Sequence, residues 1–285
     1  MIYTSKHKSA IWRYKLSVSL IALTLALSGC QTDSASEIGS EIPRTEGLTT
    51  SIALMQAGRT AENRGEFADA AALYRSAHKA DTKNPEPLVA LGKALAQGGA
   101  VSEAADAFRF ALKQDPKHPE ALRGLGNVLV ALNQPELAIP YYQRAMEIDG
   151  INYRNFLGLG VAYDIIGDHE AARAMYETSL NHSPNNPDIL ANMGLSYALT
   201  GEFEVALQLA KETANLADTT YHHRLTLTLI YGLAGDFDAA RHISSQDFDS
   251  ATVERNISYF QNLRALNDPA ERLKGVRAYY TGSNS

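Results

Sequence analysis

The strongest constraint in this sequence is a constant interval at which the same residue types return between positions 51 and 250. Only 20 of the 285 residues are glycine, so chance does not explain five glycines in one register. The glycine column is Gly58, Gly92, Gly126, Gly160 and Gly194. An alanine column with the same interval is Ala70, Ala104, Ala138, Ala172, Ala206 and Ala240. A fixed interval of this size predicts one small structural unit stacked many times.

Two further columns indicate what each unit contains. The turn column is Gly65, Gly99, Asn133, Gly167, Gly201 and Gly235. The aromatic column is Tyr74, Phe108, Tyr142 and Tyr176, followed by Ala210 and Ser244. Glycine and asparagine tolerate the left-handed backbone that ends a helix, so the turn column predicts the end of a first helix. The glycines and alanines would let a second helix pack closely, with the aromatic ring filling the gap towards the next unit.

The interval and the columns resemble the tetratricopeptide repeat, a helix-turn-helix unit of about 34 residues. The resemblance is carried by "LVALGKALAQGGAVSEAADAFRFALKQDP" at 88–116 and by "FLGLGVAYDIIGDHEAARAMYETSLNHSP" at 156–184. It implies an all-α fold, a solenoid in which paired helices form a right-handed superhelix. The expected repeats are 51–84, 85–118, 119–152, 153–186, 187–220 and a degenerate sixth repeat at 221–250.

Residues 251–285 break the interval but keep a helical pattern. "VERNISYFQNLRAL" places four large apolar side chains on one face, namely Val253, Ile257, Phe260 and Leu263. The segment that follows opens with Asp268 as N-cap, Pro269 in the first helical position and Glu271 to complete a capping box. We therefore expect two C-terminal capping helices that cover the exposed end of the stack.

Residues 1–29 have the pattern of an export signal. Four basic residues precede a short uncharged run, Leu16 to Leu27. A helix of that length is too short for a hydrocarbon core of about 30 Å. A basic start, a short apolar run and small residues before a cleavage point are typical of a signal peptide.

Cys30 is the only cysteine in the chain and directly follows this signal. "LSGC" at 27–30 resembles a bacterial lipobox, which implies lipidation of Cys30 with a diacylglyceryl group. The alternative is an ordinary signal peptide with an incidental thiol. Gln31 stands where inner-membrane lipoproteins commonly carry aspartate, so the family rule implies an outer membrane lipoprotein that faces the periplasm. Residues 30–50 would form the lipidated N-terminus and a flexible tether, because they are rich in Ser, Thr, Glu and Gly.

The charge and the motifs argue against nucleic acid binding and against catalysis. The formal net charge is −6, and removal of residues 1–29 would take it to −10, whereas nucleic acid binding needs clustered basic residues. "HEAAR" at 169–173 begins like a zinc-protease motif, but Arg173 occupies the position of the second histidine. His222 and His223 are expected to be solvated rather than to share a metal. We therefore predict a non-enzymatic protein with no metal and no cofactor.

The first helices of the repeats would line an inner groove, and their side chains predict two different halves. The N-terminal half is polar, and its set resembles the Lys, Asn and Arg residues of carboxylate clamps, although the spacing differs: Arg59, Lys93, Arg123, Asn127 and Arg154. The C-terminal half is apolar: Leu157, Val161, Ile165, Leu195, Leu199, Leu229 and Leu233. Two occupants of the apolar half remain open, an amphipathic helix of a protein partner or the chain's own helices at 253–280.

The order of signal, tether, repeats and closing segment "VERNISYFQNLRAL" resembles the TadD lipoprotein family of tight-adherence (Flp) pilus systems. That resemblance implies a role in pilus assembly, with the outer-membrane secretin or another pilus assembly component as protein partner. The alternatives are a pilotin or assembly factor of another secretion or type IV pilus system, or a peptidoglycan-synthesis regulator. An envelope hydrolase with appended repeats is disfavoured, because the sequence leaves no non-repeat domain larger than the segment 251–285.

Overall fold

The structure is a computed structural model that describes residues 44–281, so the expected signal peptide, Cys30 and residues 31–43 lie outside the described part. The described residues form fourteen α-helices and no strand. Helices α1 to α7 are α1 (Arg44–Asn63), α2 (Phe67–Ala80), α3 (Glu86–Gln97), α4 (Val101–Gln114), α5 (Pro119–Ala131), α6 (Pro135–Asp149) and α7 (Tyr153–Ile166). Helices α8 to α14 are α8 (His169–His182), α9 (Pro187–Thr200), α10 (Phe203–Ala214), α11 (Tyr221–Ala234), α12 (Phe237–Ser244), α13 (Ser250–Ala265) and α14 (Pro269–Thr281).

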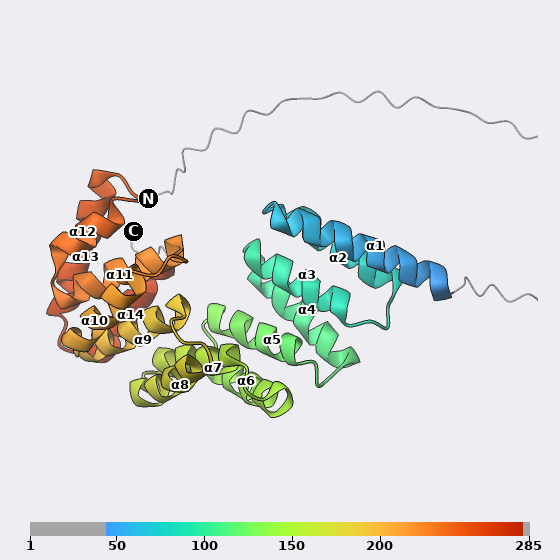
Figure 1. The fold of residues 1–285 in the computed structure, drawn as a ribbon, viewed down its shortest axis with the longest axis horizontal. Helices are drawn as coiled ribbons and strands as arrows, with labels where there is room; N and C mark the ends of the chain where they lie inside the picture. The colour runs from blue at the N-terminus through green and yellow to red at the C-terminus, as the bar shows by residue number, and fades with distance from the viewer. Residues whose placement is uncertain (1–43, 282–285) are drawn as a thin grey trace, which may run out of the picture. The chain divides into compact units, whose positions relative to one another are not determined.

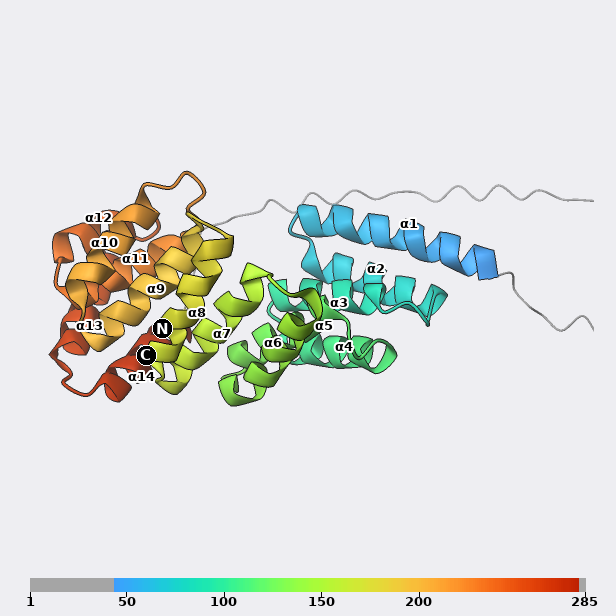
Figure 2. The ribbon, with the colours of Figure 1, turned by 60° about the horizontal axis from the view of Figure 1, so that its bottom comes forward.

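The helices form six consecutive pairs, from α1 with α2 to α11 with α12. Figure 1 and Figure 2 show how helices of successive repeats follow one another along the chain. Each pair also packs against the next pair along the chain. The first helices of neighbouring repeats are in contact as well, so that α3, α5, α7, α9 and α11 form one continuous layer. The predicted all-α solenoid fold is confirmed.

The turn column adopts the left-handed backbone that its residue types predicted. All six positions have positive φ, from 61° at Asn133 to 88° at Gly201 and Gly235. Asn133 occupies the turn where the other repeats have glycine, because its short polar side chain tolerates this conformation. The first helix of each repeat therefore ends at a position fixed by backbone chemistry.

The aromatic column joins successive repeats. Phe108 on α4 is 2% exposed, and its ring lies between Gly92 on α3 and Gly124 on α5. A β-carbon on Gly92 would lie 2.8 Å from the ring, and one on Gly124 would lie 2.5 Å from it. Tyr142 sits in the same way between two glycines, one from its own repeat and one from the next. The absence of a β-carbon on both sides is what admits the ring.

The alanine column packs the second helices into the same core. All six of its members are fully buried at 0% exposure: Ala70, Ala104, Ala138, Ala172, Ala206 and Ala240. A larger side chain at these positions would separate the paired helices, since protein interiors are packed without spare volume.

The last repeats replace the missing aromatic with other side chains. In the fifth repeat, Gly194 faces Ile230 and Leu209 at 3.2 and 3.3 Å from where its β-carbon would be. In the sixth repeat α12 has only eight residues. The ring of Phe260 on α13 packs against Gly232 on α11 and so takes the place of the missing aromatic. The predicted apolar face of α13 is buried throughout, at 5% exposure or less.

Both ends of the described chain extend the repeat stack. Helix α1 begins at Arg44 and includes residues 44–50, which were expected to belong to the tether. The extension packs against α2: Gly47 lies against the carbonyl of Ala80, and Ser51 Oγ donates to the carbonyl of Ala77 at 3.0 Å. At the other end Asp268 caps α14 as predicted, with its Oδ1 accepting from Ala270 N at 2.9 Å. None of the described helices is both long enough and apolar enough to cross a membrane.

The packing of Phe108 makes a prediction about Gly92. Replacing a helical glycine by alanine normally stabilises a helix by about 0.5–1 kcal/mol. Gly92→Ala should instead lower the free energy of unfolding by about 1–3 kcal/mol, because the new methyl group would collide with the ring. The measurement is chemical denaturation followed by circular dichroism.

A double-mutant cycle provides the control. In a Phe108→Leu background the same Gly92→Ala substitution should cost much less, because the ring is gone. Stabilisation by Gly92→Ala in the wild-type background would show that the ring does not require the glycine.

Candidate binding groove

A cavity of about 720 Å³ lies along the layer of first helices, from α5 to α11. One wall comes from α5, α7, α9 and α11, and the opposite wall comes from α14. The apolar lining residues on the repeat side are Val130, Ala131, Val161, Ile165, Ala191, Leu195 and Leu199. On the α14 side, Leu273 and Val276 are apolar and Lys274 and Arg277 are basic. We call this cavity the groove.

Helix α14 is held in place by contacts with α9 and α13. Arg272 Nη1 donates to the carbonyl of Leu199 at 2.8 Å, and Tyr259 OH donates to the carbonyl of Gly275 at 2.8 Å. Val276 is 2% exposed, and the ring of Tyr279 stacks on that of Tyr259 with centroids 6.2 Å apart. The structure thus places the chain's own last helix against the apolar part of the first-helix layer, and the groove is the space left beside it.

The predicted apolar residues fall into three groups. Val161, Ile165, Leu195 and Leu199 line the groove. Leu157 is half-buried and packs on the small cluster around Tyr176 and Ile189. The others, Leu229 and Leu233, are fully buried at 0% exposure in the core that includes α13 and α14. They stabilise the closure of the stack and present no surface to a partner.

Two of the predicted polar residues already have carboxylate partners. Lys93 Nζ lies 2.9 Å from Glu120 Oε1. Burial opposes ionisation of Glu120, but the hydrogen bond and charge of Lys93 outweigh it and lower the pKa of that carboxyl. Arg123 Nη1 lies 3.1 Å from Asp149 Oδ2 and also donates to Asn155 Oδ1 at 3.2 Å. A carboxylate ligand would have to displace these partners.

The remaining polar residues of that set have other surroundings. Asn127 Oδ1 accepts a hydrogen bond from Tyr142 OH at 2.8 Å. The guanidinium of Arg154 lies 4.6 Å from the centroid of the Tyr153 ring, an arrangement typical of a cation–π contact. Arg59 is exposed on α1. The role of these five residues in binding a ligand stays a prediction.

A buried carboxylate that sequence reasoning missed lies in the groove wall. Asp164 is 8% exposed and accepts hydrogen bonds from Tyr176 OH at 2.8 Å and Ser196 Oγ at 2.7 Å, while His169 Nδ1 lies 2.7 Å away. Burial, together with the charge and hydrogen bond of Asp164, holds the pKa of Tyr176 well above its usual range. The sequence held one signal of this contact, an acidic residue at the same position of another repeat. This residue is Glu62, whose Oε2 accepts a hydrogen bond from Tyr74 OH at 2.8 Å.

His223 is buried, so the expectation that both tandem histidines are solvated is wrong for this one. The residue is 6% exposed, Nδ1 accepts from Thr220 N at 2.9 Å, and Nε2 lies 2.8 Å from Asp188 Oδ1. The physical reason is its place in the first turn of α11, where free backbone N–H groups need an acceptor. His222 is exposed at the groove.

The residues of the "HEAAR" segment make structural contacts. His169 binds Asp164, and Arg173 Nη1 binds Glu202 Oε1 at 2.7 Å. Within residues 44–281, no group of three or more His, Cys, Asp or Glu side chains is placed to hold a metal ion. What the groove can do chemically is bind: its walls are mainly apolar, with polar groups at defined points, as in surfaces that receive an amphipathic helix.

The comparisons with known families agree with this architecture. Two models described as tetratricopeptide repeat match residues 89–150 and 153–186. No curated protein matches the chain in sequence.

Solved structures of tetratricopeptide proteins share the fold. PilW, described as a widely conserved type IV pilus biogenesis factor, aligns with TM-score 0.60 and 21% identity over 69% of this chain and 91% of its own. PilF of Pseudomonas aeruginosa aligns with TM-score 0.57 and 21% identity over 71% of this chain and 91% of its own. MamA of Desulfovibrio magneticus RS-1 aligns with TM-score 0.52 and 22% identity over 60% of this chain and 98% of its own. This chain therefore carries tetratricopeptide repeats, and its described part has the all-α solenoid fold of that repeat class.

Proposed function

We propose that this protein is a non-enzymatic scaffold that holds a protein partner in the groove during assembly of a pilus. The observation that carries the proposal is the groove itself, a cavity of about 720 Å³ with mainly apolar walls on two sides. Leu195 and Ile165 are only half-buried there, so apolar surface is left for a partner. An amphipathic helix or a short apolar segment would cover it.

The groove favours a partner with both apolar and polar groups. Leu195 and Val161 offer apolar contact, whereas Asp188 and His222 lie at the same cavity and are exposed. Lys274 on the opposite wall adds a basic group. Polar groups at the margin of an apolar centre fix the orientation of a bound segment, while the centre supplies most of the affinity.

The pilus role has two supports of different kinds. The order of segments resembles the TadD family, and PilW, whose fold is similar, is a type IV pilus biogenesis factor. We propose the tight-adherence (Flp) pilus as the system and its secretin as the partner whose assembly or localisation is assisted. The second candidate is a pilotin or assembly factor of a type IV pilus, which the similarity to PilW favours.

The proposed location is the outer membrane, facing the periplasm, with a lipid on Cys30 as the anchor. Anchoring of this kind becomes stable when two or more acyl chains are attached. Residues 31–43 separate Cys30 from α1. A chain of that length reaches at most about 45 Å when fully extended, so the repeats would work close to the membrane surface.

The groove is tested by photo-crosslinking in the native host. A photoreactive amino acid at Leu195 should capture the pilus secretin, because this residue lies in the groove wall. The control position is Leu137, an apolar residue on α6 that is 57% exposed and does not line the groove. Crosslinked products are identified by mass spectrometry.

The identity of the crosslinked protein and the position that captures it decide between the two candidate functions. Capture of the secretin from Leu195 and not from Leu137 supports the proposal, whereas a component of a different pilus system favours the second candidate. Equal capture from both positions, or none from Leu195, contradicts a role for the groove.

The anchor is tested by metabolic labelling with radioactive palmitate. The wild-type chain should incorporate the label and fractionate with the outer membrane. Cys30→Ser should lose both properties, because no other cysteine is present to accept a lipid. Ser28→Thr, a change of one small polar residue in the same segment, serves as the control and should keep the label. An unlabelled wild-type chain would contradict lipidation.

A further inference from the structure

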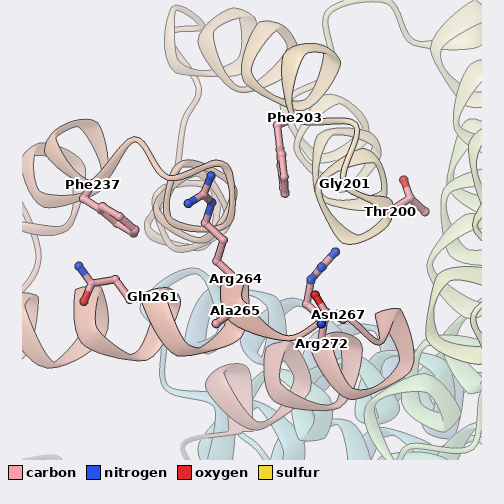
Figure 3. Close-up of a pocket in the computed structure, with 9 residues that line it drawn as sticks. All are labelled: Thr200, Gly201, Phe203, Phe237, Gln261, Arg264, Ala265, Asn267 and Arg272. Atoms are coloured by element: carbon pink, nitrogen blue, oxygen red, sulfur yellow. The ribbon is translucent and has the colours of Figure 1, made fainter.

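A second cavity, of about 450 Å³, lies where the C-terminal helices meet the last two repeats. It is bounded by the turn between α9 and α10, the start of α12, the end of α13 and the start of α14. Figure 3 shows the Arg264 side chain reaching between Phe203 and Phe237, with Arg272 pointing toward the same space. We call it the arginine cavity. Its volume is in the range of ligand pockets, about 300–1,000 Å³.

The arginine cavity is positively charged without a compensating acid. All of its lining residues are described, and none of them is Asp or Glu. Seven other described arginines form ion pairs with carboxylates: Arg64, Arg75, Arg109, Arg123, Arg173, Arg224 and Arg241. In the described part of the chain no carboxylate lies within 4.0 Å of a guanidinium nitrogen of Arg264 or Arg272. Two guanidinium groups without an ion-pair partner among the described residues attract a negatively charged ligand.

The two arginines are held in different ways. Arg272 donates from Nη1 to the carbonyl of Leu199 and from Nη2 to the carbonyl of Leu266, both at 2.8 Å, while its Nε is buried without a partner. The guanidinium of Arg264 packs over Gly235, where a β-carbon would lie 3.0 Å from Cζ. Arg264 is exposed and keeps its donors available. Arg272 therefore supplies fixed positive charge, and Arg264 supplies the hydrogen bonds for a ligand.

Aromatic side chains form the apolar part of the same cavity. Phe203 and Phe237 are the first residues of α10 and α12, and both are half-buried. A planar guanidinium binds a carboxylate through two parallel hydrogen bonds and also packs against aromatic rings. The combination suits a ligand that carries a carboxylate next to an aromatic or large apolar group.

The chain itself contains an example of this recognition. Arg224 donates from Nε and Nη2 to the two carboxylate oxygens of Asp247, at 2.7 and 2.6 Å. The next residue, Phe248, packs against Tyr221 with ring centroids 6.2 Å apart. An Asp–Phe pair is thus bound by one arginine and one aromatic ring. Arg264 and the rings of Phe203 and Phe237 present the same groups, and no carboxylate of the described residues is paired with Arg264.

We propose that the arginine cavity binds a short acidic–aromatic segment of a protein partner. The carboxylate of an Asp or Glu side chain would accept two hydrogen bonds from Arg264, and the neighbouring aromatic ring would lie against Phe203 and Phe237. The arginine cavity and the groove share no lining residue, although α9 contributes to both. The arginine cavity is a second contact point for a partner and does not depend on the proposed role in pilus assembly.

The test is binding of a blocked peptide to the purified full chain. The probe is fluorescein-labelled Ser-Gly-Asp-Phe-Gly-Ser with both termini blocked, so that Asp carries its only peptide carboxylate. Fluorescence anisotropy should show saturable binding. Arg264→Gln should weaken the affinity by at least about tenfold, because a charge-assisted bidentate contact is lost. Arg255→Gln, also exposed on α13, should leave it within about twofold.

Further variants separate this site from the groove and from non-specific charge attraction. Changing Asp to Asn in the peptide should weaken binding to the same extent as Arg264→Gln. Leu195→Lys, which alters the groove, should leave peptide binding unchanged. The proposal is overturned by any of three results: no binding to the wild type at about 1 mM peptide, equal binding by Arg264→Gln, or loss of binding in Leu195→Lys.

Discussion

The structure depends on an aromatic ring shared between two repeats. Phe108 belongs to the second helix of one repeat, yet its ring fills the space left by glycines of that repeat and of the next. A repeat of this kind cannot bury its own apolar surface, so stability comes from the interfaces between neighbours. This sharing explains why the members of each column are separated by a constant interval, because each ring must meet the next pair of glycines in the same geometry.

Both candidate sites arise where the sharing stops. The aromatic column ends in Ala210 and Ser244, and Phe260 from α13 then fills the place above Gly232. Closing the stack in this way brings α14 back against α9, which creates one wall of the groove and one side of the arginine cavity. The segment that departs from the repeat is therefore the segment that shapes the binding surfaces.

The sequence predicted the parts of the fold that repeat, and much less of the parts that do not. Asn133 could be placed in a left-handed turn because five glycines share its column, and the apolar face of α13 followed from helical spacing. The contacts of Asp164 with Ser196 and of His223 with Asp188 were missed, because these partners lie about one repeat away and depend on side-chain direction. The sequence left open whether α14 or a partner's helix covers the apolar half of the first-helix layer, since no column relates α14 to the repeats. The partners of Lys93 and Arg123 could not be foreseen either, because these contacts also depend on the directions of side chains far apart in the sequence.

The central claim is that the chain's own last helix covers the apolar half of the first-helix layer and leaves the groove beside it. Nuclear Overhauser effects in a selectively labelled full chain measure this directly. The account predicts contacts between the side chain of Arg272 on α14 and Leu199 on α9, and between the rings of Tyr259 and Tyr279. Absence of both contacts in a folded chain, with random-coil shifts for residues 269–281, would contradict it.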